Sequence, residues 1–427
     1  MRRKSMEVVG TVAAIVAVLG AASGIFGHQR TRKDSTCRLA RAECVAVEDN
    51  ATVAGIEDVS GENTACTAPL FPNAKAAYVM EHSGKVPVFE KDSLKHLPIA
   101  SMCKIMTLLL TFEAIDQGVL TENEMISISE NAAAMGGSQV FLEANAQYPL
   151  NELIKSIVVC SANDSCVALA ERIAGSTDIF VDKMNDRAKE LGCENTLFAN
   201  CTGLPKEPQY SCARDVAVMM SALIEHEDYF SYGKIWTDSF QHPQGRTTEI
   251  TNTNRLVRFY DGCDGGKTGF TNEAGFCLVA TAKRGNMRLI SVVIGEKDSK
   301  TRFKEISESF DYTFANYTMQ VVVDSNTPIE ESLTVSGGKK KSLPIKPLRD
   351  GLLFLKRGEV ANVDVQVFVD SKKTAPIQQG ETVGELRVFC DGIEKDRIPL
   401  IAAENIEKAT YWDTLIDVAK DWNFCGR

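Results

Sequence analysis

One lysine inside a largely apolar segment constrains the fold of this chain more than any other residue. The segment PIASMCKIMTLLLTFEAI, residues 98–115, has the composition of a core helix, yet Lys104 stands one turn after Ser101. Burying an ammonium group is unfavourable unless the group finds partners or loses its proton. The segment therefore predicts a buried helix in which the lysine has a chemical purpose.

The composition excludes several classes of function. The chain has 427 residues, 44% of them hydrophobic, which is enough for two or three domains with a sizeable core. A net charge of -10 argues against nucleic acid as a partner. None of the five histidines is paired at ligand spacing, so no metal centre is indicated and no cofactor is expected.

The N-terminal residues 1–27 have the pattern of an export signal. Basic residues 2–4 precede an apolar run from Val8 to Gly27, and small residues at 20–22 offer a cleavage site. The run is also long enough to remain as an uncleaved membrane anchor. Both alternatives place the rest of the chain outside the cytoplasm, and the polar residues 28–66 are predicted to be a linker.

The 13 cysteines are odd in number and include no CxxC pair. Four lie in apolar runs, where a free thiol behaves as a small hydrophobic group: Cys103, Cys160, Cys166 and Cys277. Three lie in polar surroundings, where pairing stays open: Cys37, Cys44 and Cys66.

Residues 67–320 are predicted to form an α+β domain. Two short strands surround a Ser83-Gly84 turn, and two apolar strands surround a Gly285-Asn286 turn. Helical segments lie between these strands, including one from Ser101 to about Gly118. Strands at both ends with helices between them are typical of an α+β fold.

The C-terminal part is predicted to contain a small all-β domain at 321–401. Valines alternate from Val363 to Val369, and Asp391-Gly392 is a strong hairpin turn. Residues 402–427 are predicted to form an amphipathic helix with an apolar stripe at Ile406, Ala409, Ile416, Ala419 and Trp422. Its tryptophans favour a membrane surface and its acidic face favours packing on the chain's own domains, so both stay open.

The spacing of Ser101 and Lys104 suggests nucleophilic catalysis. A serine hydroxyl attacks well only when a base takes its proton, and residues three apart on a helix share one face. Burial and nearby cations lower the pKa of a lysine and turn it into such a base. The pattern is weak alone, because Ser231/Lys234 and Ser336/Lys339 repeat it in polar stretches where solvated residues are expected.

Two further motifs follow in the chain. Ser161-Ala162-Asn163 interrupts two helical segments and presents a hydroxyl and an amide there, although Asn163 is also a plausible helix cap. Lys267-Thr268-Gly269 stands at the start of a predicted edge strand, which can align a substrate backbone. Lys267 and Thr268 would hold a carboxylate and Gly269 would allow close approach, although a surface turn is the alternative.

Together, and in this order, the three motifs are the set shared by penicillin-binding proteins and β-lactamases. With the stretches SANDSCVALAERIAGS, QYSCARDVA and GGKTGFTNEAGFCLVATAKRG, the chain resembles the serine D-Ala-D-Ala carboxypeptidases. These are the low-molecular-weight penicillin-binding proteins of peptidase family S11. The resemblance implies a penicillin-binding fold followed by a β domain and a terminal helix that set the enzyme at the membrane.

The resemblance also implies roles for individual residues. Ser101 corresponds to the acylated nucleophile, Lys104 to its base, Ser161 to the proton relay and Asn163 to the group that orients Lys104 and the substrate amide. The binders of the terminal carboxylate correspond to Lys267, Thr268 and Arg302, with a solvated arginine as the alternative for the last. The backbone N–H groups of Ser101 and Phe270 would form the oxyanion hole. Phe270 stands where relatives often have histidine.

The implied substrate is a peptidoglycan stem peptide, and β-lactams are the implied inhibitors. The implied location is the outer face of the bacterial membrane or the cell wall. One rival is a β-lactamase, which needs a carboxylate-activated water for which the sequence offers no convincing glutamate. A second rival is a wall-binding protein without catalysis, which the intact motifs disfavour.

Overall fold

The computed structural model describes residues 8–10, 42–45, 70–121, 123–327, 329, 332–369 and 372–416. They divide into two compact units. The first, here called the α+β unit, is Gly55–Asn316, and the second, here called the β unit, combines Met1–Ala54 with Tyr317–Arg427.

An antiparallel sheet forms the centre of the α+β unit, with strand order β4-β3-β11-β10-β9. Its strands are β3 (Ala76–Glu81), β4 (Val86–Lys91), β9 (Cys263–Thr271), β10 (Gly275–Arg284) and β11 (Met287–Glu296). Arg284 pairs with Met287 across the Gly285-Asn286 turn, as the sequence predicts. β9 lies at one edge, so one side of its backbone is not paired within the sheet.

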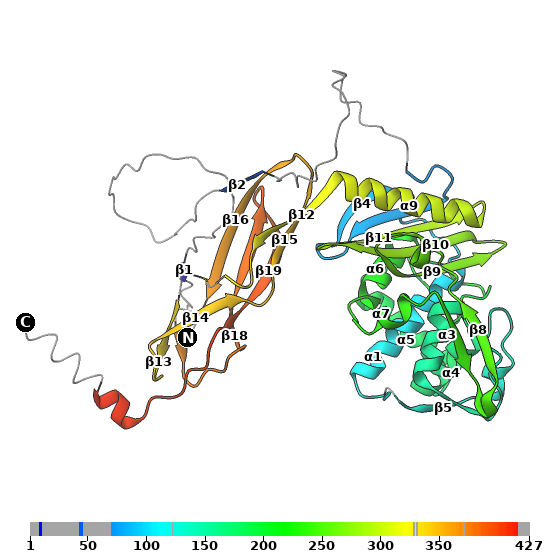
Figure 1. Ribbon diagram of the computed structural model, residues 1–427, viewed down its shortest axis with the longest axis horizontal. Coiled ribbons are helices and arrows are strands. Elements are labelled where there is room, and N and C mark those ends of the chain that lie inside the picture. The colour runs from blue at the N-terminus through cyan, green and yellow to red at the C-terminus, as the bar shows by residue number, and fades with distance from the viewer. Residues whose placement is uncertain are drawn as a thin grey trace, which may run out of the picture. The chain divides into compact units, whose positions relative to one another are not determined.

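Helices cover both faces of this sheet, which buries its apolar residues (Figure 1). α9 (Ser299–Asn316) packs against β10 and β11, while α6 (Ala213–Leu223) packs on β3 and β11 from the opposite face. The remaining helices are η1 (Ala100–Cys103), α1 (Lys104–Asp116), α2 (Glu130–Ala133), α3 (Leu150–Cys160), α4 (Asn163–Ala174), α5 (Thr177–Glu190), α7 (Tyr229–Gly233), η2 (Pro243–Gly245) and α8 (Leu256–Phe259). Two short hairpins complete the unit: β5 (Met125–Ser127) with β6 (Gln147–Pro149), and β7 (Thr237–Gln241) with β8 (Thr247–Thr251).

The predicted helix after Pro98 is confirmed as a core element. Nine of its residues in α1 are buried, from Lys104 to Ala114, in the main hydrophobic core of the unit. The serine in front of it belongs to η1, a 3₁₀ turn that runs directly into α1. Ser101 is therefore held at the N-terminal end of a buried helix, next to the edge strand β9, with which η1 is in contact.

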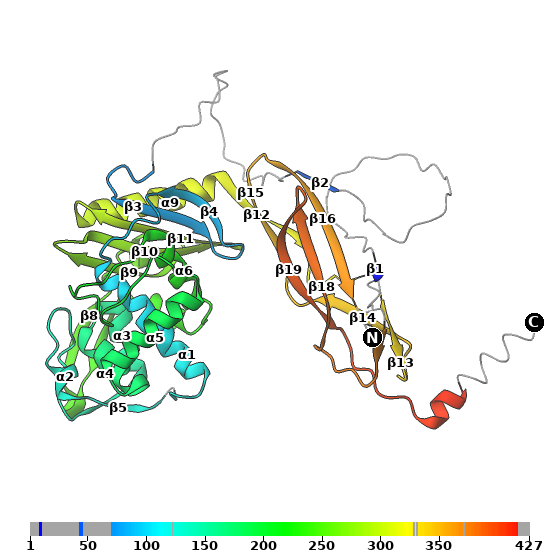
Figure 2. The same cartoon turned by 180° about the vertical axis from the view of Figure 1, so that it is seen from behind.

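The β unit has its own core between strands (Figure 2). Its strands are β1 (Val8–Gly10), β2 (Ala42–Val45), β12 (Tyr317–Val323), β13 (Ser332–Ser336), β14 (Ser342–Pro347), β15 (Gly351–Lys356), β16 (Val360–Val369), β17 (Lys372–Thr374), β18 (Thr382–Cys390) and β19 (Ile393–Ala402). Val363, Val365 and Val367 of β16 are buried, as the alternation predicts. Asp391 and Gly392 both have positive φ, which confirms the predicted hairpin turn.

The predicted helix at 402–427 is wrong at its start. β19 continues to Ala402, and Ile406 is buried in the β core, where it forms a bridge with Ile377. Pairing of Ile406 with a strand satisfies its backbone and its side chain together, so the helical spacing of this residue was coincidental. Residues 411–416 are helical, and the rest of the predicted helix lies outside the described residues.

Most of the predicted export segment 1–27 and of the linker 28–66 also lies outside the described residues. Within these ranges the structure describes β1 and β2, which pair with β16. In the part of the chain that is described, no helix is both long and apolar enough to cross a membrane.

Candidate functional site

The side chains of Ser101 and Lys104 meet as predicted. Lys104 is fully buried, and its Nζ lies 3.1 Å from Ser101 Oγ. Nζ also donates to the backbone carbonyl of Thr202, at 2.5 Å. The spacing of one helical turn thus brings an amine and a hydroxyl into hydrogen-bond contact inside the protein.

The surroundings of Lys104 favour its neutral form. Burial lowers the pKa of Lys104, and the ionisable groups that counter this effect are thiols rather than carboxylates. Burial raises the pKa of Cys103 and of Cys201 to about 12, so these thiols are uncharged at neutral pH. An amine without a nearby anion gives up its proton more readily, which is the property that a base for the adjacent hydroxyl requires.

Lys267 is the second buried amine of the site. It lies in β9, and its Nζ donates to the Thr268 carbonyl at 3.0 Å. Burial, and next the charge of Lys104, lowers its pKa well below the ordinary value. Like charges at close range disfavour double protonation, so the charge of Lys104 adds to the effect of burial on Lys267.

Ser161 and Asn163 occupy the junction of α3 and α4. Ser161 has φ 66° and ψ 34°, the left-handed conformation that ends α3, and its buried Oγ has no hydrogen-bond partner among the described residues. Asn163 does not cap α4, because its Nδ2 donates to the carbonyl of Gly136 at 2.7 Å. Neither side chain therefore forms a helix-capping hydrogen bond, although the backbone of Ser161 ends α3.

The Lys267-Thr268-Gly269 motif lies within β9, not at the start of a strand as predicted, because β9 begins at Cys263. A Cβ on Gly269 would stand 2.6 Å from the Ile99 carbonyl and 3.4 Å from the Ser101 nitrogen. The glycine therefore allows the edge strand to pack against the residues in front of Ser101. Thr268 Oγ1 donates to Thr253 Oγ1 at 2.8 Å.

Arg302 is buried on α9 and is not the solvated arginine that was the alternative. It donates to the carbonyl groups of Gly269 and Cys277. It therefore reaches the C-terminal part of β9 from the face of the sheet that α9 covers. Burial lowers its pKa to about 10, which still leaves a cation at neutral pH. The ring of Phe270 is half exposed and lies against Phe276, with 4.4 Å between ring centroids.

Several contacts of the site have no local sequence signal. The Thr202 carbonyl binds Lys104 from 98 positions away. Next to it, Gly203 has φ +79°, and a Cβ there would stand 2.0 Å from the carbonyl oxygen of Ala100. The only hint of this loop in the sequence is its Thr-Gly-Leu-Pro turn, which fixes no partner.

The other two Ser-x-x-Lys patterns lie on the surface. Ser231 Oγ donates to the Asp228 carbonyl, and Lys234 is exposed over the ring of Phe230. Lys339 forms an exposed ion pair with Glu407. Across the described ranges, no group of three or more histidine, cysteine or acidic side chains could hold a metal ion.

Comparison with protein families gives two matches. Residues 62–298 match the family of D-alanyl-D-alanine carboxypeptidases, peptidase family S11. Residues 317–408 match the family described as the C-terminal domain of penicillin-binding protein 5.

Individual relatives agree with these matches. D-alanyl-D-alanine carboxypeptidase DacF of Bacillus subtilis is 38% identical, over 83% of this chain and 92% of its own. D-alanyl-D-alanine carboxypeptidase DacC of Escherichia coli is 32% identical, over 82% of this chain and 89% of its own. Among solved structures, penicillin-binding protein 5 of Haemophilus influenzae aligns at TM-score 0.62 with 28% identity, over 79% of this chain and 98% of that one. Penicillin-binding protein D2 of Listeria monocytogenes with bound ampicillin aligns at TM-score 0.51 with 30% identity, over 56% of this chain and 97% of that one.

Proposed function

Because this chain belongs to the D-alanyl-D-alanine carboxypeptidase family, we propose that Ser101 is its acylated nucleophile and Lys104 the base. The enzyme is a penicillin-binding serine carboxypeptidase, which hydrolyses the terminal D-Ala-D-Ala bond of peptidoglycan stem peptides. The observation that carries the assignment of roles is the fully buried Lys104 Nζ at 3.1 Å from Ser101 Oγ.

In the first step, neutral Lys104 takes the proton of Ser101 as Oγ attacks the carbonyl carbon between the two D-alanines. The carbonyl oxygen becomes an oxyanion, which accepts hydrogen bonds from the backbone N–H groups of Ser101 and Phe270. The close packing of Gly269 against the Ser101 amide supports this pairing of donors from η1 and β9.

In the second step, the bond between the carbonyl carbon and the leaving nitrogen breaks. Ser161 passes a proton from Lys104 to that nitrogen, and D-alanine departs. The unpartnered Oγ of Ser161 supports a role as relay, because a buried hydroxyl without a partner is free to bond a transient group. Water then attacks the ester, and its hydrolysis frees the shortened peptide and restores Ser101.

The terminal carboxylate binds the cationic side of the site. Lys267, Thr268 and Arg302 supply the ammonium, hydroxyl and guanidinium groups for it. A bound carboxylate would favour the protonated form of Lys267, so substrate binding itself supplies the charge that burial removes. Asn163 holds the substrate amide and orients Lys104.

We place the reaction on the extracytoplasmic side of the membrane, where peptidoglycan lies, with residues 1–27 as export signal or anchor. Surface association through the C-terminal end is supported by exposed apolar side chains in residues 411–416: Tyr411, Trp412, Leu415 and Ile416.

Mass spectrometry of a stem pentapeptide incubated with the protein tests the role of Ser101. We expect loss of one D-alanine with the native chain and no loss with Ser101→Ala. Retained hydrolysis by Ser101→Ala would contradict the assignment. Benzylpenicillin should form a long-lived adduct on Ser101, whereas fast turnover of the drug would indicate a β-lactamase instead.

A further inference from the structure

Lys104 has a second hydrogen-bond partner, which the catalytic steps above do not use. Its Nζ lies 3.1 Å from Ser101 Oγ and donates to the backbone carbonyl of Thr202 at 2.5 Å. A carbonyl oxygen can only accept, so one N–H of the amine is committed to Thr202 in both the neutral and the protonated form. The lone pair of the neutral amine is left to the remaining directions, one of which faces Ser101. The carbonyl thus helps to orient the base.

The Thr202 carbonyl is not held in place by a helix or a strand. It belongs to the loop of residues 198–209, which contains neither kind of element. Inside regular elements the backbone bonds of a helix or a sheet fix the direction of each carbonyl group. In this loop the direction of the Thr202 carbonyl therefore depends on side chains.

Asn200 supplies the support. Its Oδ1 accepts hydrogen bonds from the backbone nitrogen of Gly203 at 2.7 Å, and from the backbone nitrogen and the hydroxyl of Thr202, each at 3.1 Å. Its Nδ2 donates to the carbonyl of Leu204 at 2.8 Å. The N–H of Gly203 and the carbonyl of Thr202 belong to one planar trans peptide group, in which they point in opposite directions. A fixed N–H therefore aims the carbonyl away from Asn200 and towards Lys104.

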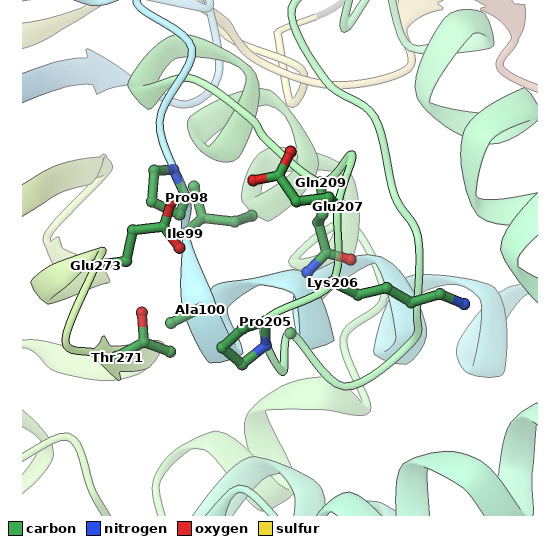
Figure 3. Close-up of a pocket in the computed structure, with 10 residues that line it drawn as sticks. Pro98, Ile99, Ala100, Pro205, Lys206, Glu207, Gln209, Thr271 and Glu273 are labelled. Atoms are coloured by element: carbon green, nitrogen blue, oxygen red, sulfur yellow. The ribbon is translucent and has the colours of Figure 1, made fainter.

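Asn200 is itself anchored on two sides. Its backbone nitrogen donates to Gln209 Oε1 at 3.1 Å, and its backbone carbonyl accepts from Cys103 Sγ at 3.2 Å. Cys103 belongs to η1, the turn that also carries Ser101. Gln209 of the loop and Ala100 of η1 line the same cavity (Figure 3). The side chain that fixes this peptide group is therefore held at a defined position relative to the nucleophile.

The carbonyl also acts on the product of proton transfer. As Ser101 Oγ bonds to the substrate carbonyl carbon, its proton moves to the lone pair of Lys104, which becomes an ammonium group. Burial disfavours this ammonium. A hydrogen bond from a charged donor is stronger than one from a neutral donor, so the carbonyl of Thr202 offsets part of the cost of burial.

We propose that Asn200 is a positioning residue of the reaction, because it holds the Thr202–Gly203 peptide group with its carbonyl on Lys104. Asn200 acts through this carbonyl, which orients the neutral amine towards Ser101 and stabilises the ammonium that follows. The inference rests on the proposed function and adds the residue that prepares its base.

The pH dependence of acylation by benzylpenicillin, measured on the full-length protein by intact-protein mass spectrometry, tests the proposal. In the native protein the second-order rate constant should rise with pH as Lys104 loses its proton. Asn200→Ala removes the three acceptor bonds of Oδ1. We expect the midpoint of the rise to move down by about one pH unit, because the ammonium loses a hydrogen bond. The plateau rate should fall about tenfold, because the amine is less well oriented.

Asn200→Asp distinguishes positioning from a general loss of structure. Its carboxylate keeps the acceptor oxygen, so its plateau rate should exceed that of Asn200→Ala, while its negative charge should move the midpoint up. Asn195→Ala is the matched control, because Asn195 Oδ1 contacts His96 Nε2 instead. This control should keep the native midpoint and plateau, and thermal unfolding verifies that each variant is folded.

A lower rate in Asn200→Ala with an unmoved midpoint would overturn the role of Asn200, as would midpoints that move in the same direction in the two Asn200 variants. Should Asn200→Ala fail to fold, an unmoved midpoint in folded Asn200→Asp decides against the proposal. In each of these cases Ser101 still forms the adduct, so the proposed function stands. Absence of an adduct on Ser101 in the native protein would instead overturn the proposed function.

Discussion

At the scale of single residues, Lys104 combines complete burial with the absence of a carboxylate among the groups that shift its pKa. A lysine in that position lowers stability, because the unfolded chain binds a proton that the folded chain holds weakly. The cost is greatest below the lowered pKa and disappears as pH rises above the ordinary value of 10.5. Such strain is characteristic of sites where activity takes precedence over stability.

Ser161 is a second residue whose conformation and burial lower the stability of the fold. Its left-handed backbone favours glycine, and its buried hydroxyl lacks a partner. We expect Ser161→Gly to raise the free energy of unfolding by about 1 kcal/mol. The same change should lower the turnover of a D-Ala-D-Ala peptide by about 100-fold, because the proton relay is lost. Thermal unfolding and steady-state kinetics measure both, and a variant with native turnover would remove Ser161 from the mechanism.

At the scale of elements, the proposed nucleophile Ser101 is positioned by close packing between η1 and the loop at Gly203. We expect Gly203→Ala to displace Ala100, since the new Cβ would stand 2.0 Å from its carbonyl oxygen. The rate of acylation by penicillin should fall about tenfold or more, and the free energy of unfolding should fall by about 2 kcal/mol or more. Gly118→Ala is the matched control, with φ +71° and no atom within 4 Å of the added Cβ. The free energy of unfolding of this control should fall by about 1 kcal/mol, and penicillin should acylate it at the native rate. Equal acylation rates in the two variants would contradict the packing argument.

The junction of β11 and α9 gives a prediction on pH. Burial, and next the neighbouring carboxylate of Glu305, raises the pKa of Glu296 from 4.5 to about 8. The folded state therefore binds more protons than the unfolded state between these values, and stability falls as pH rises through this window. Glu296→Gln should remove this loss. Its free energy of unfolding should be about 2 kcal/mol higher than that of the native protein at pH 8 and equal to it near pH 4. Denaturant unfolding at both pH values measures the difference, and a pH-independent difference would be inconsistent with the shared burial of the two carboxylates.

At the scale of the whole molecule, the α+β unit and the β unit each have a separate hydrophobic core. We expect two transitions in calorimetry. Leu386→Ala, in the β core, should lower the free energy of unfolding of the β unit by about 2–5 kcal/mol and leave penicillin acylation unchanged. Leu153→Ala should instead lower the free energy of unfolding of the α+β unit. A Leu386→Ala variant that loses acylation would show that the β unit supports the catalytic site.

The sequence predicts the local parts of this molecule well, because they depend on short-range spacing. The contact of Ser101 with Lys104 and the turns at Gly285 and Asp391 follow from neighbours in the chain. The contact of Lys104 with Thr202 joins residues 98 positions apart, and the position of Arg302 on the buried face of α9 depends on how this helix packs on the sheet. Ile406 fits a helical stripe in sequence yet pairs with a strand, since tertiary contacts override local spacing.

We propose that a buried, neutral amine activates the serine one turn before it, and intact-protein mass spectrometry of penicillin binding measures this activation. Lys104→Met keeps an unbranched side chain, one atom shorter, and removes the base, and thermal unfolding verifies that the variant is folded. At pH 7 the native protein should gain one benzylpenicillin on Ser101, whereas Lys104→Met should acylate at least about 100-fold more slowly. Acylation of folded Lys104→Met at the native rate would contradict the claim.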